Sequence, residues 1–163
     1  MIVLRSTSPA ETKEIGRRLG ETLKMGDTVL LDGELGAGKT VFVSGIAEAL
    51  GYSGYITSPT YTLVNEYRDL KLDLFHMDAY RIENPDDIIG AGFDEYLGSN
   101  GVKVVEWAKL IGSYAPPDSI RVSIEKSGQS GQSGQSGLDG DVDGRTISIW
   151  GKPSEKLGFA PER

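Results

Sequence analysis

The residues best suited to chemistry stand together at positions 33–40, which read Gly-Glu-Leu-Gly-Ala-Gly-Lys-Thr. The pattern Gly-x-x-x-x-Gly-Lys-Thr is typical of a loop that holds the phosphates of a nucleoside triphosphate. We expect Gly33, Gly36 and Gly38 to permit positive φ angles and close approach, so that successive N–H groups turn toward phosphate oxygens. Lys39 would reach the β- and γ-phosphates, and the Thr40 hydroxyl would ligate Mg²⁺.

The alternative is an ordinary glycine-rich turn in a chain that has 22 glycines. At average residue frequencies, a chance match in a chain of this length has a probability on the order of one per cent. We therefore favour a nucleotide site. Its expected residues are those of the loop and of the following helix start: Gly33, Glu34, Leu35, Gly36, Ala37, Gly38, Lys39, Thr40 and Val41.

Two carboxylates stand at the ends of apolar runs, Asp78 after residues 72–77 and Glu106 after residues 102–105. Phosphate-binding loops of this kind work with an acidic residue near the metal, and strand ends form the ligand-binding edge of an α/β sheet. We expect at least one of the two to serve Mg²⁺ or its water shell; the alternative is a capping or surface carboxylate. His76 should lie on the same side of its strand as Asp78, in a packing or supporting role more than in direct chemistry.

The elements around the loop have the order that such a site needs. Ser8 is an N-cap candidate for a helix at residues 9–24, in which apolar residues recur every fourth position. A short apolar strand at residues 28–31 precedes the loop, and residues 41–50 have helical spacing. The segment is therefore strand, glycine loop and helix, which is the context of a phosphate-binding loop.

The rest of the chain alternates between strand-like and helical segments. Further strands are expected at residues 1–5, 61–67, 71–77, 102–105, 119–126 and 145–150, and short helices at residues 84–97 and before Pro116. This order predicts an α/β chain with a P-loop NTPase-like three-layer fold and a mixed, mostly parallel central sheet.

One domain spanning residues 1–163 accommodates all of these elements. Residues 127–137 repeat Ser-Gly-Gln without an apolar side chain, which predicts a flexible low-complexity loop at residues 127–144. Residues 139–144 resemble part of a calcium loop but lack the closing glutamate, so an acidic hairpin tip is favoured there.

Composition excludes several classes of function. The chain has no cysteine and one histidine, which excludes a disulfide scaffold, a cysteine nucleophile and a multi-histidine zinc site. The net charge of -7 argues against strong non-specific binding of nucleic acid, so contact with RNA would be local or through a partner. Without a long apolar run or a signal peptide, we expect a cytoplasmic protein that is not embedded in a membrane.

Four motifs in fixed order give the chain a specific resemblance. Beside residues 33–40, these are Ser58-Pro59-Thr60-Tyr61, His76-Met77-Asp78-Ala79-Tyr80-Arg81 and Val105-Glu106-Trp107. Together they resemble the TsaE family, also called YjeE, small bacterial ATPases required for threonylcarbamoyladenosine formation in tRNA next to the anticodon. The resemblance covers residues 8–150, and its departure from the family pattern is the repeat at residues 127–137 with the acidic segment that follows it.

The resemblance implies roles for particular residues. Residues 58–60 would form a switch-like segment over the γ-phosphate, with Thr60 near the metal or the attacking water. Asp78 would be the acidic residue of the metal site, and Glu106 would lie close to Mg²⁺ or orient water. The implied catalytic residues are Lys39, Thr60, Asp78 and Glu106, and the implied metal-site residues are Thr40, Asp78 and Glu106, with ATP and Mg²⁺ as cofactors.

The resemblance also concerns three further residues of these motifs, and for Trp107 and Arg81 two interpretations stay open. Trp107 would pack at the site or face a partner, or else be a core aromatic residue. Tyr80 and Arg81 would help to close the site. Arg81 would stabilise charge on the transferring phosphate, as arginine fingers do, or form a salt bridge.

The resemblance also implies partners, the proteins TsaD and TsaB, which carry out the modification with tRNA bound to them. ATP hydrolysis would be weak in the isolated chain and would reset that complex between turnovers. A small-molecule or nucleotide kinase is the main alternative, although the chain shows only scattered arginines (Arg68, Arg81, Arg121, Arg145) where a kinase lid needs several. A GTPase lacks support because no Asn-Lys-x-Asp segment occurs, and a binding module with a structural nucleotide is the last alternative.

Overall fold

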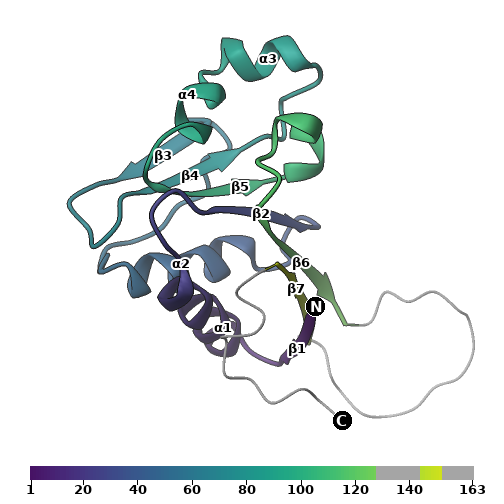
Figure 1. Cartoon of the computed structure of the whole chain (residues 1–163). Coiled ribbons are helices and arrows are strands. Elements are labelled where there is room, and N and C mark those ends of the chain that lie inside the picture. Colours follow the sequence, from purple (N-terminus) through teal and green to yellow (C-terminus); the bar gives the residue numbers. More distant parts are fainter. Residues whose placement is uncertain (128–143, 152–163) are drawn as a thin grey trace, which may run out of the picture.

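The computed structural model describes residues 1–127 and 144–151 (Figure 1). The flexible loop predicted at residues 127–144 and the calcium-loop comparison at residues 139–144 lie, apart from their end residues, outside the described residues. The two ends are close, because the Ser127 N–H donates to the Gly144 carbonyl at 2.8 Å.

A seven-stranded sheet in the order β1-β7-β6-β2-β5-β4-β3 forms the centre of the described structure. Its strands are β1 (Ile2–Ser6), β2 (Thr28–Gly33), β3 (Val64–Tyr67), β4 (Leu74–Asp78), β5 (Val102–Glu106), β6 (Ile120–Lys126) and β7 (Arg145–Trp150). The neighbours β6, β2, β5 and β4 pair in parallel, whereas β7 and β1 at one edge and β3 at the other are antiparallel. The predicted mixed, mostly parallel sheet is confirmed.

Helices cover both faces of this sheet (Figure 1). They are α1 (Pro9–Thr22), α2 (Lys39–Ala49), α3 (Pro85–Gly90), α4 (Phe93–Leu97) and the 3-10 helix η1 (Ala108–Tyr114). Within residues 1–127 and 144–151, none of them is both long and apolar enough to cross a membrane. Successive side chains of β2 point to opposite faces of the sheet and contact both helical layers. Val29 and Leu31 pack with α1 and α2, and Leu30 packs with α3, α4 and η1.

The helix α1 begins where the sequence indicated. The Ser8 hydroxyl accepts the Glu11 N–H at 3.2 Å, and the Glu11 carboxylate accepts the Thr7 N–H at 2.7 Å. α1 then lies directly against α2, because a Cβ at Gly16 would stand 2.1 Å from the Phe42 carbonyl oxygen. Only glycine permits this approach, which fixes α1 beside the helix that carries Lys39.

The hairpin of β3 and β4 differs from the prediction at both strands. The strand predicted from residue 61 begins at Val64, and the strand predicted from residue 71 begins at Leu74. Residues 60–63 instead form a turn, in which Leu63 has φ +65° and its N–H donates to the Pro59 carbonyl at 2.7 Å. The β-forming side chains of Tyr61 and Thr62 gave the wrong prediction because two hydrogen bonds with Asp78, from the Thr60 hydroxyl to its carboxylate and from its N–H to the Leu63 carbonyl, hold this segment in a turn.

Candidate functional site

The glycine-rich loop joins the end of β2 to the start of α2, as the sequence predicted. Gly36 and Gly38 have φ +74° and +105°, values that favour glycine. Gly33 keeps an ordinary φ, which corrects the expectation of a positive one, and is needed for a different reason. A Cβ there would stand 2.7 Å from the Ile124 carbonyl oxygen of β6. The shape of the loop thus depends on two glycines with positive φ angles and on one close contact between main chains.

Lys39, the first residue of α2, points back under this loop. Its ammonium donates to the carbonyls of Gly33 at 2.8 Å and Glu34 at 3.0 Å, and it lies 4.7 Å from the centre of the Trp107 ring. The side chain is 7% exposed. Burial lowers the pKa of Lys39, and the charges of Glu106, Asp78 and Asp32, in that order, oppose this effect. Three carboxylates are therefore close enough to favour the charged form of one buried ammonium group.

Asp78 and Glu106 end neighbouring parallel strands and stand in register with one another. Glu106 is also the register partner of Leu31 near the end of β2. Leu31 packs on the layer of α1 and α2, and side chains in register lie on the same face of a sheet. Both carboxylates consequently lie on the α2 side, 2% and 3% exposed, at the edge where Lys39 begins its helix.

Both Asp78 oxygens are held by the chain itself. Oδ2 accepts from the Thr60 hydroxyl at 3.0 Å, and Oδ1 accepts from the Tyr80 N–H at 2.8 Å. The Thr60 hydroxyl also lies 2.8 Å from that of Ser58. Asp78 therefore fastens the segment of residues 58–60 to the end of β4.

Glu106 is held from one side only among the described residues. Its Oε1 lies 2.7 Å from Nε2 of the buried His76. Glu106 also lines a cavity of about 460 Å³, together with residues of the loop, of α2 and of residues 58–60. The full lining is Pro9, Thr12, Leu35, Gly36, Gly38, Lys39, Thr40, Val41, Ser58, Thr60, Glu106, Trp107 and Arg145.

This cavity brings together most of the residues that the sequence singled out, with Asp78 adjacent through Thr60. It also includes Pro9, Thr12 and Arg145, which sequence reasoning did not assign to the site. Arg145 donates to the Ala37 carbonyl at 3.2 Å, so β7 contacts the loop from a distant part of the chain. The sequence identified Ser8 and Pro9 as the start of a helix, but their proximity to the loop follows only from the packing of α1 on α2.

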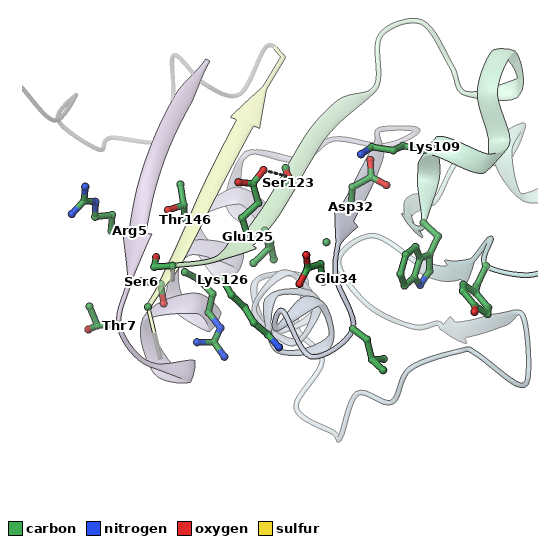
Figure 2. A pocket seen from close by; sticks show the side chains of 18 residues that line it. Arg5, Ser6, Thr7, Asp32, Glu34, Lys109, Ser123, Glu125, Lys126 and Thr146 are labelled. Carbon is green, nitrogen blue, oxygen red and sulfur yellow. Dashed lines mark hydrogen bonds between the residues drawn. The ribbon is translucent and has the colours of Figure 1, made fainter. Parts of the chain in front are cut away.

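A second, larger cavity of about 1140 Å³ is lined in part by the first residues of the loop, Gly33, Glu34 and Leu35 (Figure 2). Its walls include Arg5, Thr146 and Lys126 from the β1–β7–β6 edge and Asp32, Glu34 and Lys109 from the opposite side. Leu35, Trp107 and Arg145 line both cavities. Tyr80 packs at 5.2 Å against the Trp107 ring, which places an aromatic pair at their common border.

Trp107 and Arg81, the two motif residues with open interpretations, have defined surroundings in the structure. Trp107 is at the site, in a left-handed conformation with φ +56°, and its N–H donates to the Leu31 carbonyl at 3.1 Å. The Arg81 guanidinium lies 5.6 Å from the Tyr61 ring, so it contacts the segment that follows residues 58–60.

A parallel sheet with a glycine loop between its central strand and a covering helix defines the P-loop-like class of α/β proteins. Comparison with known proteins gives the family: residues 6–134 match the model of "Threonylcarbamoyl adenosine biosynthesis protein TsaE". The chain therefore belongs to the TsaE family, whose members take part in tRNA threonylcarbamoyladenosine biosynthesis.

Matches to individual proteins support this family assignment. The chain is 43% identical to the tRNA threonylcarbamoyladenosine biosynthesis protein TsaE of Bacillus subtilis, over 76% of this chain and 77% of the relative. It is 40% identical to the corresponding protein of Treponema pallidum, over 73% and 87% of the two chains. A crystal structure of Bacillus subtilis YdiB matches with a TM-score of 0.73 and 35% identity, covering 96% of this chain and 90% of that one.

Proposed function

We propose that this protein binds ATP with Mg²⁺ and hydrolyses it in the cytoplasm, in support of tRNA threonylcarbamoyladenosine formation by a TsaD–TsaB complex. The observation that carries the proposal is the convergence of Lys39, Thr40 and Glu106 on one cavity beneath the glycine loop. Membership of the TsaE family supports the pathway, and the side chains of this cavity support the chemistry.

The shape of the loop fits a phosphate chain. Gly36 and Gly38 have positive φ angles, and a Cβ at Gly33 would meet the Ile124 carbonyl oxygen, so three positions of the loop carry no side chain that could obstruct a phosphate. The N-terminus of α2 adds the positive end of its helix dipole. The Lys39 ammonium donates to the carbonyls of Gly33 and Glu34 at the start of the loop, where it supplies positive charge for the β- and γ-phosphates.

The donor set fits Mg²⁺. The Thr40 hydroxyl and the Glu106 carboxylate are oxygen ligands, and Mg²⁺ prefers few protein oxygens together with phosphate and water. Among the described residues there is no group of three or more His, Cys, Asp or Glu side chains that could hold a metal alone. We assign Asp78 to the metal site through Thr60 and the water shell, because its own oxygens are already engaged.

Hydrolysis would proceed by attack of water in line with the bond between the γ-phosphorus and the oxygen that leaves with ADP. The new O–P bond forms as that bond breaks, and the proton of the water passes to the phosphate or to solvent. Lys39 and the loop N–H groups stabilise the charge that develops on the phosphate oxygens, and Thr60 orients the water. Bound Mg²⁺ supplies further charge neutralisation at the phosphates.

Dependence on a partner agrees with the surface around the site. Leu35 and Tyr80 are exposed large side chains that line these cavities, and the exposed Tyr61 follows Thr60 in the chain. Aromatic side chains are enriched at protein interfaces. The acidic net charge of -7 favours a protein partner over direct contact with tRNA.

The test is ATP turnover by the isolated chain and by the chain mixed with TsaD and TsaB, with binding to that pair measured with and without ATP. We expect turnover to rise when the pair is added, and binding to depend on the nucleotide. Binding that is indifferent to nucleotide, with no stimulated turnover, would support a structural nucleotide and overturn the proposal.

A small-molecule or nucleotide kinase is the second candidate, and the cavity of about 1140 Å³ beside the loop favours it as an acceptor site. Transfer of the γ-phosphate to a nucleoside or metabolite panel, without any partner, would support it. Release of inorganic phosphate alone would leave the ATPase as the better account.

A further inference from the structure

His76 lies in the middle of β4 with no exposed surface, at 0%. Its neighbours in register are Asn65 on β3 and Val104 on β5. A packing role alone would be served better by an apolar side chain, because an imidazole carries two polar nitrogens into the sheet. The reason for a histidine at this position must therefore lie in its polar contacts.

Those contacts are unequal. Nε2 lies 2.7 Å from Oε1 of Glu106, whereas Nδ1 is buried without a hydrogen-bond partner in the described part of the chain. A carboxylate oxygen accepts hydrogen bonds, so Nε2 is the nitrogen that carries the proton. A proton on Nδ1 would be a buried donor without an acceptor, which is energetically unfavourable. The geometry thus selects the tautomer with N–H at Nε2.

This hydrogen bond limits the freedom of the Glu106 carboxylate. The terminal torsion of glutamate is broad, so an unsupported carboxylate turns readily and presents either oxygen to the cavity. With Oε1 bound to His76, Oε2 is the oxygen left for a ligand in the cavity that Glu106 lines. Asp78 shows the contrast, since both of its oxygens are held by Thr60 and Tyr80.

We infer that His76 is a positioning residue, which donates from Nε2 to Glu106 and thereby orients the free carboxylate oxygen toward the Mg²⁺ of the bound nucleotide. This inference rests on the proposed function. It assigns His76 no contact with the nucleotide and no proton transfer; its effect passes through Glu106. Hydrogen-bonding partners of a metal ligand commonly change metal affinity by about 10–100-fold when they are removed.

The quantity that tests this is the metal gain, defined as the Kd of the non-hydrolysable analogue AMPPNP in EDTA divided by its Kd in Mg²⁺. Calorimetric titration of the full chain measures it. We expect His76→Phe, which keeps a ring but has no donor, to reduce the gain by about tenfold. His76→Gln, whose amide can still donate to Glu106, should retain the gain to within about threefold. Affinity in EDTA should stay within about twofold in both variants.

A double variant at His76 and Glu106 distinguishes a positioning role of His76 from a general structural defect. In a Glu106→Gln background, His76→Phe should lower the metal gain no further, because the group that His76 orients has already lost its charge. A further tenfold loss in the double variant would contradict the inference. So would a single His76→Phe variant with the metal gain of the wild type.

The single histidine of the chain allows a measurement that needs no variant. In protein labelled with ¹⁵N-histidine, long-range ¹H–¹⁵N spectra should show one imidazole with its proton on Nε2 and a shifted Nε2 signal on addition of Mg²⁺ and AMPPNP. A proton on Nδ1 alone would overturn the inference, even if His76→Phe failed to fold. Absence of any metal gain in the wild type would instead overturn the proposed function.

Discussion

Two buried lysines, at opposite ends of the parallel strands, show how the proposed nucleotide site differs from a purely structural contact. Lys39 and Lys103 are 7% and 1% exposed, and each donates to two main-chain carbonyls. Burial lowers the pKa of both. The contacts of Lys103 join the turn before β2, at Gly26, to the segment before β5, at Ser99.

The difference lies in what surrounds each ammonium group. Among the described residues, Asp27 alone opposes the effect of burial on the pKa of Lys103, whereas three carboxylates oppose it for Lys39. Lys39 also borders a cavity, and Lys103 lines neither of the two cavities described above. A buried lysine by itself therefore indicates only hydrogen bonds to main-chain carbonyls. A buried lysine with several carboxylates and a cavity beside it is a candidate for ligand binding.

The largest effect is expected from Lys39→Ala. Loss of the charged donor to the β- and γ-phosphates should weaken ATP binding by about 100-fold or more. Calorimetric titration with ATP and Mg²⁺ measures this, with circular dichroism to show that the fold is intact. ATP binding as tight as that of the wild type would show that the loop does not hold phosphates.

The next largest effects should distinguish the two carboxylates, Asp78 and Glu106, from one another. Glu106→Gln should reduce the metal gain by about tenfold or more, because a charged oxygen ligand is lost. Asp78→Asn should leave the metal gain within about threefold and lower ATP turnover instead, because it loosens Thr60. A larger loss of metal gain in Asp78→Asn than in Glu106→Gln would reverse the assignment of these residues.

Lys103→Met is the matched control for Lys39→Ala. Two carbonyls would lose their donor, so the free energy of unfolding should fall by about 1–3 kcal/mol in urea denaturation. Affinity for ATP with Mg²⁺ should stay within about twofold. If this variant lost ATP binding while remaining folded, the distinction between the two lysines would be wrong.

The smallest effect concerns pH. The pKa of Lys103 is lowered in the folded chain from 10.5, so the unfolded chain binds more protons as the pH approaches that value. Stability from this group should therefore rise with pH between its folded pKa and 10.5. The difference in unfolding free energy between wild type and Lys103→Met should grow over this window. A constant or shrinking difference would show that burial does not set the charge of Lys103.

Much of this arrangement could be predicted from local sequence. The strand, glycine loop and helix around Lys39 are contiguous, and apolar runs that end in a carboxylate located Asp78 and Glu106 at one sheet edge. These predictions succeeded because burial and glycine geometry act over a few residues.

Other parts depend on contacts between distant residues. The turn at residues 60–63 follows from Thr60 bonding to Asp78, and β-propensity alone gave a strand there. Arg145 reaches the loop through strand pairing of β7 with β6, and the sequence showed only an isolated arginine. His76 was placed on the correct side of its strand, but its pairing with Glu106 required the register of β4 and β5.

The most direct test of the account is a titration of the wild-type chain with ATP and with GTP, in Mg²⁺ and in EDTA. We predict one site that binds ATP at least about tenfold more tightly with Mg²⁺ than in EDTA. ATP should bind more tightly than GTP, because no guanine-specifying Asn-Lys-x-Asp segment occurs. Absence of ATP binding, or an ATP affinity that is the same in Mg²⁺ and in EDTA, would contradict the account.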